Sequence, residues 1–234
     1  MPTSGAAAGA ALDLRGRPLS DNTQGSSAAD VLSAAHEYRR RGWRVIPLHR
    51  VGPDGKTCSC RKGGNCGRNA GKHPIDLEWQ KAPALSAADV EETWGVAKPP
   101  NIGLATGPDS GFWALDIDPK NGGMESMAAL VAEHGALPET FVAQTGSEGY
   151  HYLFALPEGV VLKNSADRVG KGIDTRAAGG QIVAPPSRSG VGPYRVVVDA
   201  PVAAAPAWLI ELARAPEVDP CLLYTSDAAD EEDS

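Results

Sequence analysis

The chain has 234 residues, of which 42% are hydrophobic and 22% are charged, and its formal net charge is −7 at pH 7. This length and composition predict one folded domain with short appendages. The sequence contains no run of about 20 apolar residues, so we expect no membrane-spanning helix and no membrane partner. The N-terminus lacks a charged-then-apolar signal pattern, which favours a cytoplasmic protein.

The charge is distributed unevenly along the chain. Residues 217–234 hold seven of the 29 acids and no Lys or Arg, which leaves 22 acids and 22 bases elsewhere. Residues 39–73 hold ten Lys and Arg against the single acid Asp54. This basic segment predicts contact with a phosphate backbone, although a solvated helix end and loop would carry the same pattern. The candidate nucleic-acid-binding residues are Arg39, Arg40, Arg41, Arg44, Arg61, Lys62, Arg68 and Lys72.

Residues 1–26 are rich in Ala, Gly, Ser and Thr without apolar periodicity, which predicts a disordered leader before a domain over residues 27–216. Ser27 and Asp30 have the spacing of a capping box and predict the start of the first helix. The abrupt change in composition over 217–234 indicates an acidic tail that is truncated or non-native. We expect helices over 27–41, 86–94, 122–134 and 206–214, and strands over 43–48, 101–106, 112–118, 141–144, 150–156, 172–175, 181–184 and 194–198.

These elements predict an α+β fold with mostly antiparallel strands. The apolar runs over 101–106 and 112–118 are separated by Gly107-Pro108-Asp109-Ser110-Gly111. These residues are typical of turns, so the two runs are expected to form a hairpin.

Asp116 and Asp118 lie two residues apart in an apolar run, so both side chains should share one face of a strand while Leu115 and Ile117 enter the core. Two adjacent carboxylates repel each other unless a cation neutralises them. Their hard oxygen atoms suit Mg²⁺ or Mn²⁺. Asp174, on a separate predicted strand, would complete a site for two metal ions, the kind that catalyses phosphoryl transfer.

Cys58, Cys60, Cys66 and His73 fall within one Gly-, Lys- and Arg-rich loop over about 56–74. Three thiolates and one imidazole form a complete tetrahedral ligand set for Zn²⁺. The loop has almost no apolar residues, so it needs a cross-link such as a bound metal ion to adopt a defined structure. We therefore predict a structural zinc ion, with a flexible loop and incidental thiols as the alternative.

Taken together, residues 34–213 resemble the bifunctional DNA primase/polymerase (prim-pol) family of the archaeo-eukaryotic primase superfamily. The three motifs of that superfamily appear in order as Asp116-Ile117-Asp118, Tyr150-His151-Tyr152-Leu153-Phe154 and Ile173-Asp174. The D-x-D motif alone also occurs in glycosyltransferases and nucleases, so the ordered set carries the resemblance. The flanking segments 101–107, 184–187 and Gly71-Lys72-His73-Pro74 are similar as well.

The resemblance implies a catalytic sheet like that of the RNA-recognition motif (RRM-like), with an added N-terminal α/β unit. It implies template-directed nucleotide addition and primer synthesis in plasmid, phage or mobile-element replication. The expected partners are single-stranded DNA template and primer, NTP or dNTP, and a helicase domain or protein. Asp116, Asp118 and Asp174 match the catalytic metal ligands, and His151 matches the residue that contacts the phosphates of the incoming nucleotide.

Several other residues are expected near that nucleotide. Arg176 lies two residues after Asp174 and shares its strand face, so it should meet phosphate or pair with Asp174. Ser147 is the nearest match to the small residue of the second motif. Further nucleotide-binding candidates from nearby loops and strand ends are Lys163, Lys171 and Gln144.

Two alternative functions fit the same residues. A metal-dependent nuclease or a sugar-nucleotide transferase would use the same three acids. A non-catalytic, zinc-containing module could instead bind nucleic acid for a replicative helicase. A nuclease would shorten DNA where a polymerase lengthens it, and a binding module would retain DNA without the aspartates.

Overall fold

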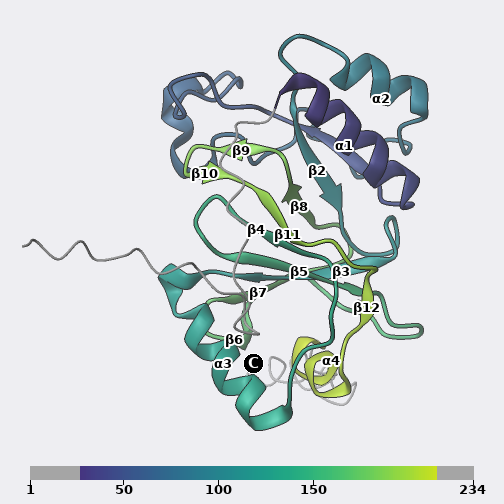
Figure 1. The fold of residues 1–234 in the computed structure, drawn as a ribbon, viewed down its shortest axis with the longest axis vertical. Coiled ribbons are helices and arrows are strands. Elements are labelled where there is room, and N and C mark those ends of the chain that lie inside the picture. Colours follow the sequence, from purple (N-terminus) through teal and green to yellow (C-terminus); the bar gives the residue numbers. More distant parts are fainter. Residues whose placement is uncertain (1–26, 215–234) are drawn as a thin grey trace, which may run out of the picture.

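The computed structural model describes residues 27–214, which form an α+β fold built on two sheets (Figure 1). The smaller sheet has the order β1-β2-β8, with β1 over Val45–Leu48, β2 over Asn101–Ala105 and β8 over Gln181–Ala184. The larger sheet has the order β11-β4-β5-β3-β7-β6, formed by Arg195–Val198, Val142–Gln144, Tyr150–Ala155, Phe112–Ile117, Ile173–Arg176 and Ser165–Gly170. These pairings are antiparallel, whereas β12 (Ala203–Ala204) runs parallel to β5. The expected α+β class is thus confirmed, while the predicted leader and acidic tail lie outside the described residues.

The helices lie on opposite sides of the larger sheet (Figure 1). α1 (Ala28–Arg40) and α2 (Ala87–Trp94) pack with the smaller sheet, and α3 (Gly123–His134) and α4 (Ala207–Ala213) lie below the larger one. The predicted capping box is confirmed, because Ser27 Oγ accepts from Asp30 N and Asp30 accepts from Ser27 N. Each helix in residues 27–214 is too short or too polar to span a lipid bilayer. The remaining short elements are the 3₁₀ turns η1 (Gly63–Asn69) and η2 (Pro119–Asn121) and the hairpin of β9 (Arg188–Ser189) and β10 (Gly192–Pro193).

Alternation along β3 determines where its acids point. Leu115 and Ile117 are fully buried on the face covered by α3 and α4, as expected. Phe112 and Ala114 point to the opposite face, where they pack with α1, α2 and the smaller sheet. Asp116 continues this second face and lines a cleft. The carboxylate of Asp116 is accessible because α1, α2 and the smaller sheet cover this face only as far as Ala114.

The predicted hairpin between residues 101–106 and 112–118 is wrong. β2 is the central strand of the smaller sheet, and β3 lies inside the larger sheet. The intervening turn carries the chain from one sheet to the other. It bends sharply at Gly107, which has φ +90° and whose Cβ, if present, would lie 2.6 Å from Ala178 Cα. The turn residues alone therefore did not predict with which strands β2 and β3 pair.

Strand β6 was not predicted from the sequence. It is an edge strand with mostly exposed residues, and its register with β7 shifts between Ser165 and Gly170. Its consecutive exposed residues 166–168 show no alternation of apolar and polar residues, and Val169 alone among its residues is buried in the core. Its pairing nevertheless matters, because it brings polar groups beside Asp174.

Candidate active site

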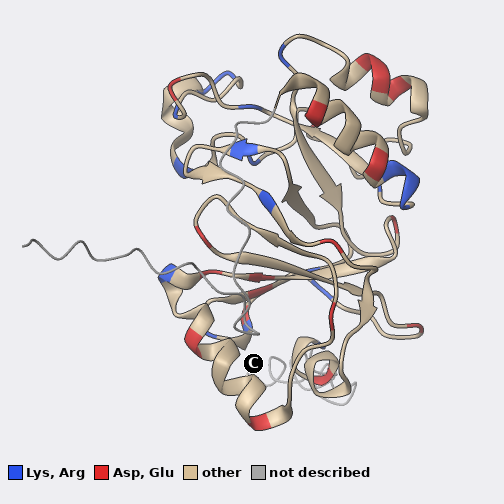
Figure 2. Cartoon of the chain, viewed as in Figure 1, with Lys and Arg blue, Asp and Glu red and all other residues tan. Residues whose placement is uncertain are grey.

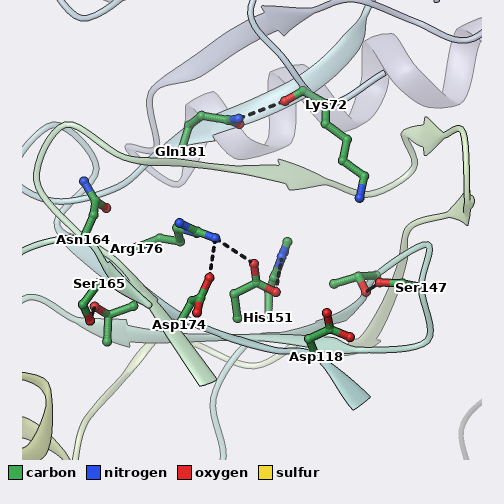
Figure 3. A network of polar contacts seen from close by, with 12 residues as sticks. Lys72, Asp118, Ser147, His151, Asn164, Ser165, Asp174, Arg176 and Gln181 are labelled. Atoms are coloured by element: carbon green, nitrogen blue, oxygen red, sulfur yellow. Dashed lines mark hydrogen bonds and ion pairs between the residues drawn. The ribbon is translucent and has the colours of Figure 1, made fainter. Parts of the chain in front are cut away.

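Three neighbouring strands place two acids and a histidine in one row. Asp116 of β3 lies opposite His151 of β5 on one side and opposite Asp174 of β7 on the other. Opposed residues in an antiparallel sheet have their side chains on the same face. The three side chains accordingly lie on one face of the larger sheet, and Figure 3 shows His151 and Asp174 on that face. The structure thus brings together three residues from distant parts of the sequence, of which Asp116 and Asp174 are 58 positions apart.

Asp118 stands where β3 ends and η2 begins. Its Oδ1 accepts a hydrogen bond from Lys120 N at 2.9 Å, and its Oδ2 accepts one from Asn121 Nδ2 at 2.8 Å. The carboxylate therefore caps the 3₁₀ turn while it lines the cleft beside Asp116. A carboxylate has about four lone-pair positions, so capping leaves room for a cation.

Arg176 partly neutralises the row of acids. Its Nη2 donates to Asp174 Oδ2 at 2.8 Å and to Asp116 Oδ2 at 3.4 Å (Figure 3). His151 Nε2 lies 3.5 Å from Asp116 Oδ1. Burial works to raise the pKa of Asp116, but His151 and Arg176 outweigh it and lower that pKa to about 2. Asp116 is thus held as a carboxylate at neutral pH.

Asp174 is in a different electrostatic environment. Its burial raises its pKa above the ordinary value, and Arg176 only partly offsets this effect. A divalent cation beside both carboxylates would favour the ionised form of each. The side chains of Asp116 and Asp174 are 30% and 28% exposed, so water can reach them. Three solvent-accessible carboxylates fit Mg²⁺ or Mn²⁺, since such ions take oxygen ligands and keep several waters.

A cleft of about 990 Å³ opens above this row. Its floor is the larger sheet, and its opposite wall includes β8 and the end of the cysteine-bearing loop. Figure 2 shows acids on strands of the larger sheet and basic residues on the loop above it. The charged residues that line the cleft are Asp116, Asp118, Asp167, Asp174, Arg68, Lys72, Lys120 and Arg176. An acidic floor that faces basic side chains can hold cations and phosphate groups together.

The loop between β4 and β5 closes one side of the cleft. It packs tightly against the end of β3, because a Cβ on Gly149 would lie 2.2 Å from Ile117 O. Ser147 lines the cleft, with its Oγ 3.1 Å from Thr145 Oγ1. Glu148 has φ +68° and is exposed, and it does not line the cleft. The acid next to Ser147 therefore lies away from the cleft.

The predicted zinc ligands also converge. The ligand atoms of Cys58, Cys60, Cys66 and His73 all lie within 4.8 Å of one another. The Sγ atoms of Cys58 and Cys66 are each 3.4 Å from His73 Nε2. Burial and the neighbouring thiols raise the pKa of Cys66 to about 11. A cation that prefers thiolates would reverse this shift, and the donor set fits Zn²⁺.

Three predicted nucleotide-binding residues do not line the cleft. Gln144 pairs with Tyr150 inside the sheet ladder. Lys163 offers its carbonyl to Thr175 Oγ1 on β7. The aliphatic part of Lys171 lies near Gly122 at the start of α3. Their nearness in sequence to the motifs therefore did not place them beside the acids.

The predicted nucleic-acid-binding residues divide into two groups. Arg68 and Lys72 line the cleft, whereas Arg61 and Lys62 are exposed outside it. The residues in or just after α1 contact other parts of the protein: Arg39 bonds Leu85 O, Arg40 pairs with Glu37, Arg41 pairs with Glu37 and Asp199, and Arg44 pairs with Asp109 and bonds Trp79 O and Ala82 O. The side chain of Arg44 is only 10% exposed, and its guanidinium is used by contacts inside the fold, unlike those of Arg61 and Arg68.

Sequence reasoning missed other residues of the cleft. Asp167 on β6 has φ +54° and accepts a hydrogen bond from Gly172 N at 2.6 Å. Its own N–H donates to Asp174 Oδ1 at 3.3 Å. No motif marks Asp167, because only the pairing of β6 with β7 brings it to the site. The cleft also contains Trp79, Lys120, Asn164 and Tyr194, which belong to segments with no functional signal.

The donor atoms and the cleft together define a site suited to divalent cations and phosphate-bearing substrates. Residues 35–208 match the family model Prim-Pol, described as the N-terminal domain of bifunctional DNA primase/polymerase. The chain therefore belongs to this family, and the resemblance drawn from the ordered motifs is confirmed. Membership indicates a nucleotidyltransferase of the primase/polymerase type, with DNA and nucleotides as substrates. A comparison with curated proteins found no matching relative.

Proposed function

We propose that the row formed by His151, Asp116 and Asp174 is the catalytic centre for template-directed nucleotide transfer to a 3′ end or an initiating nucleotide. The observation that carries this proposal is the in-register convergence of the row at the floor of an open cleft. Phosphoryl transfer depends mostly on positioning and charge neutralisation. A rigid sheet supplies positioning, because each side chain is fixed by strand register.

Asp116, Asp118 and Asp174 would hold two Mg²⁺ or Mn²⁺ ions. Such ions supply activation of the attacking hydroxyl and stabilisation of the leaving pyrophosphate. Arg176 bridges Asp116 and Asp174. The guanidinium occupies the position of a counter-ion there, and we propose that it turns to phosphate when cations neutralise the acids.

His151 would donate a hydrogen bond to a phosphate oxygen of the incoming nucleotide. The side chain is only 6% exposed, and its Nε2 faces the acid row. Its Nδ1 is buried and finds no partner in residues 27–214. The ring is therefore held by packing in β5, with Nε2 as the atom oriented towards the site. We propose that Ser147, across the same end of the cleft, also contacts the nucleotide.

Three further parts of the proposal rest on family membership and on the resemblance. The four clustered ligands Cys58, Cys60, Cys66 and His73 would hold a structural zinc ion. The larger sheet would correspond to the RRM-like catalytic sheet, and α1, α2 and the smaller sheet to the added α/β unit. The setting would be plasmid, phage or mobile-element replication with a helicase as partner.

The test is nucleotide incorporation on single-stranded DNA, with and without a primer, with each nucleotide set and with Mg²⁺ or Mn²⁺. Asp116→Asn should lower incorporation by at least about 10³-fold, because an interaction needed in the transition state is lost. Asp199→Asn is the matched control, since Asp199 is 60% exposed and lies outside the cleft lining. Circular dichroism checks that both variants are folded.

Three results would contradict the proposal. Full incorporation by Asp116→Asn would remove the acid row from the chemistry. Shortened DNA without extension would favour the nuclease. DNA binding that survives loss of all three aspartates, without pyrophosphate release by the unmodified protein, would favour the binding module.

A further inference from the structure

Lys72 is a half-buried cation in the wall that faces the acid row. Its side chain projects across the cleft towards Asp118 and His151 (Figure 3). Within residues 27–214, no carboxylate lies within ion-pair distance of its ammonium group. By contrast, Arg176 on the floor contacts two carboxylates. Asp116 and Asp118 attract the Lys72 ammonium across the cleft without forming an ion pair with it. Its hydrogen-bond donors are therefore left for an anionic ligand in the cleft.

The backbone around Lys72 is fixed at three successive residues. Gly71 O accepts a hydrogen bond from the buried Asn101 Nδ2 at 2.8 Å, and Lys72 O accepts one from Gln181 Nε2 at 3.0 Å. His73 follows directly and belongs to the Cys₃His cluster. These contacts determine where the lysine side chain leaves the wall.

Gly71 is needed for the close contact between this loop and β9. It has φ +79°, and a Cβ there would lie 2.7 Å from Arg188 O and 2.9 Å from Asn101 Nδ2. The loop can thus approach β9 closely only because this residue is glycine. The approach brings the zinc-ligand loop and the cleft wall together in one short segment.

The position of Lys72 favours the triphosphate of a nucleotide over the phosphates of a DNA backbone. A nucleotide triphosphate carries its charge on three adjacent groups and must lie against the cations held by the acid row. Lys72 faces that same row from the opposite side. A DNA backbone, by contrast, meets basic residues at exposed positions, and Arg68 is the exposed basic residue of this wall. A lysine ammonium binds phosphate as a point charge.

We propose that Lys72 binds the triphosphate of the incoming nucleotide, and that the zinc-ligand cluster holds it in position through His73. This inference rests on the proposed nucleotidyl transfer. The cysteine-bearing loop would then form part of the nucleotide site, in addition to stabilising the fold through its metal ion. Zinc occupancy and nucleotide affinity should consequently be coupled.

The first experiment measures steady-state kinetics of Lys72→Ala on a primed template. The KM for the nucleotide should rise about tenfold or more, with a smaller change in kcat, because a charge-assisted contact is lost. The Kd for template DNA should stay within about twofold. Lys56→Ala is the matched control, since Lys56 is an exposed lysine of the same loop outside the cleft lining. Lys72→Arg should recover part of the affinity.

The second experiment uses no catalysis. A non-incorporable nucleotide is titrated with Mg²⁺ into zinc-loaded and zinc-stripped protein, both as the unmodified chain and as Lys72→Ala. Zinc loss should weaken binding about fivefold or more in the unmodified chain and by much less in the variant, because contacting groups couple non-additively. Circular dichroism reports whether stripped protein is folded, and if it unfolds the kinetic experiment decides.

Two outcomes would overturn the inference. An unchanged nucleotide KM in Lys72→Ala would remove the lysine from the triphosphate site. Weakened DNA binding with unchanged nucleotide affinity would assign Lys72 to a nucleic-acid phosphate. Failure of the proposed function looks different, since the unmodified protein would then incorporate no nucleotide or Asp116→Asn would remain active.

Discussion

The two ends of the basic segment over residues 39–73 have the same charge but different surroundings. At the α1 end, Arg41 pairs with Glu37 and Asp199, and Arg44 pairs with Asp109. At the loop end, Arg68 and Lys72 line a cleft whose floor is acidic. The number of basic residues in a segment therefore gives its charge but does not predict whether it binds DNA or nucleotide. Binding depends on the basic side chains that are not already paired with acids of the same protein.

The difference has a physical origin in what surrounds each end. The α1 end packs on aromatic residues of the core, with the Arg41 guanidinium 5.4 Å from the Trp43 ring centroid. Guanidinium groups tolerate such contacts because they are planar and weakly hydrated. The loop end has few apolar residues to pack, so its position depends on backbone hydrogen bonds and on the Cys₃His cluster.

The largest expected effect comes from removal of the zinc ligand set at the loop end. Cys58→Ser should abolish stoichiometric zinc binding and lower the free energy of unfolding by about 3–5 kcal/mol, because metal binding free energy contributes to folding. Metal analysis and thermal unfolding measure the two effects.

The matched control for this change is Cys221→Ser, a cysteine outside the described residues. It should leave zinc content unchanged. A Cys58→Ser protein that keeps its zinc would show that Cys58 is not a required ligand. Loss of zinc without any change in stability would show that the loop end keeps its position without a metal.

The next effect concerns the α1 end. Arg44→Ala should lower the free energy of unfolding by about 2–4 kcal/mol, since Asp109 and two backbone carbonyls lose a partner in a largely buried site. DNA affinity should not change. Urea unfolding and a DNA-binding titration measure the two quantities.

Arg40→Ala is the control for Arg44→Ala. Its side chain is 67% exposed, and within residues 27–214 its ion pair is with Glu37 on the same helix, so the change should cost no more than about 0.5 kcal/mol. Equal destabilisation by the two variants would show that the Arg44 contacts are not important for the fold.

The smallest expected effect distinguishes the ends by DNA binding. Arg68→Ala should weaken binding to single-stranded DNA by about three- to tenfold and reduce the slope of log K against log salt concentration by about 1, with stability unchanged. Salt-dependent titrations measure this. If Arg40→Ala lowered affinity as much, the two ends would be equivalent in binding and the proposed division between them would fail.

The sequence by itself determined the features that depend on near neighbours along the chain. The Ser27 and Asp30 capping box, the burial of Leu115 and Ile117 and the shared face of Asp116 and Asp118 follow from local backbone geometry. The cysteine and histidine spacing likewise predicted a convergent cluster. The ordered motifs predicted the family, which the match over residues 35–208 confirmed.

Only the tertiary structure decided which distant groups meet. It separated β2 from β3, paired β6 with β7, and so placed Asp167 beside Asp174. It also set the arginines of the α1 end against internal acids and left Lys72 facing the acidic floor of the cleft. Local patterns fix the face on which a side chain lies, whereas its partner is chosen by packing among segments far apart in the chain.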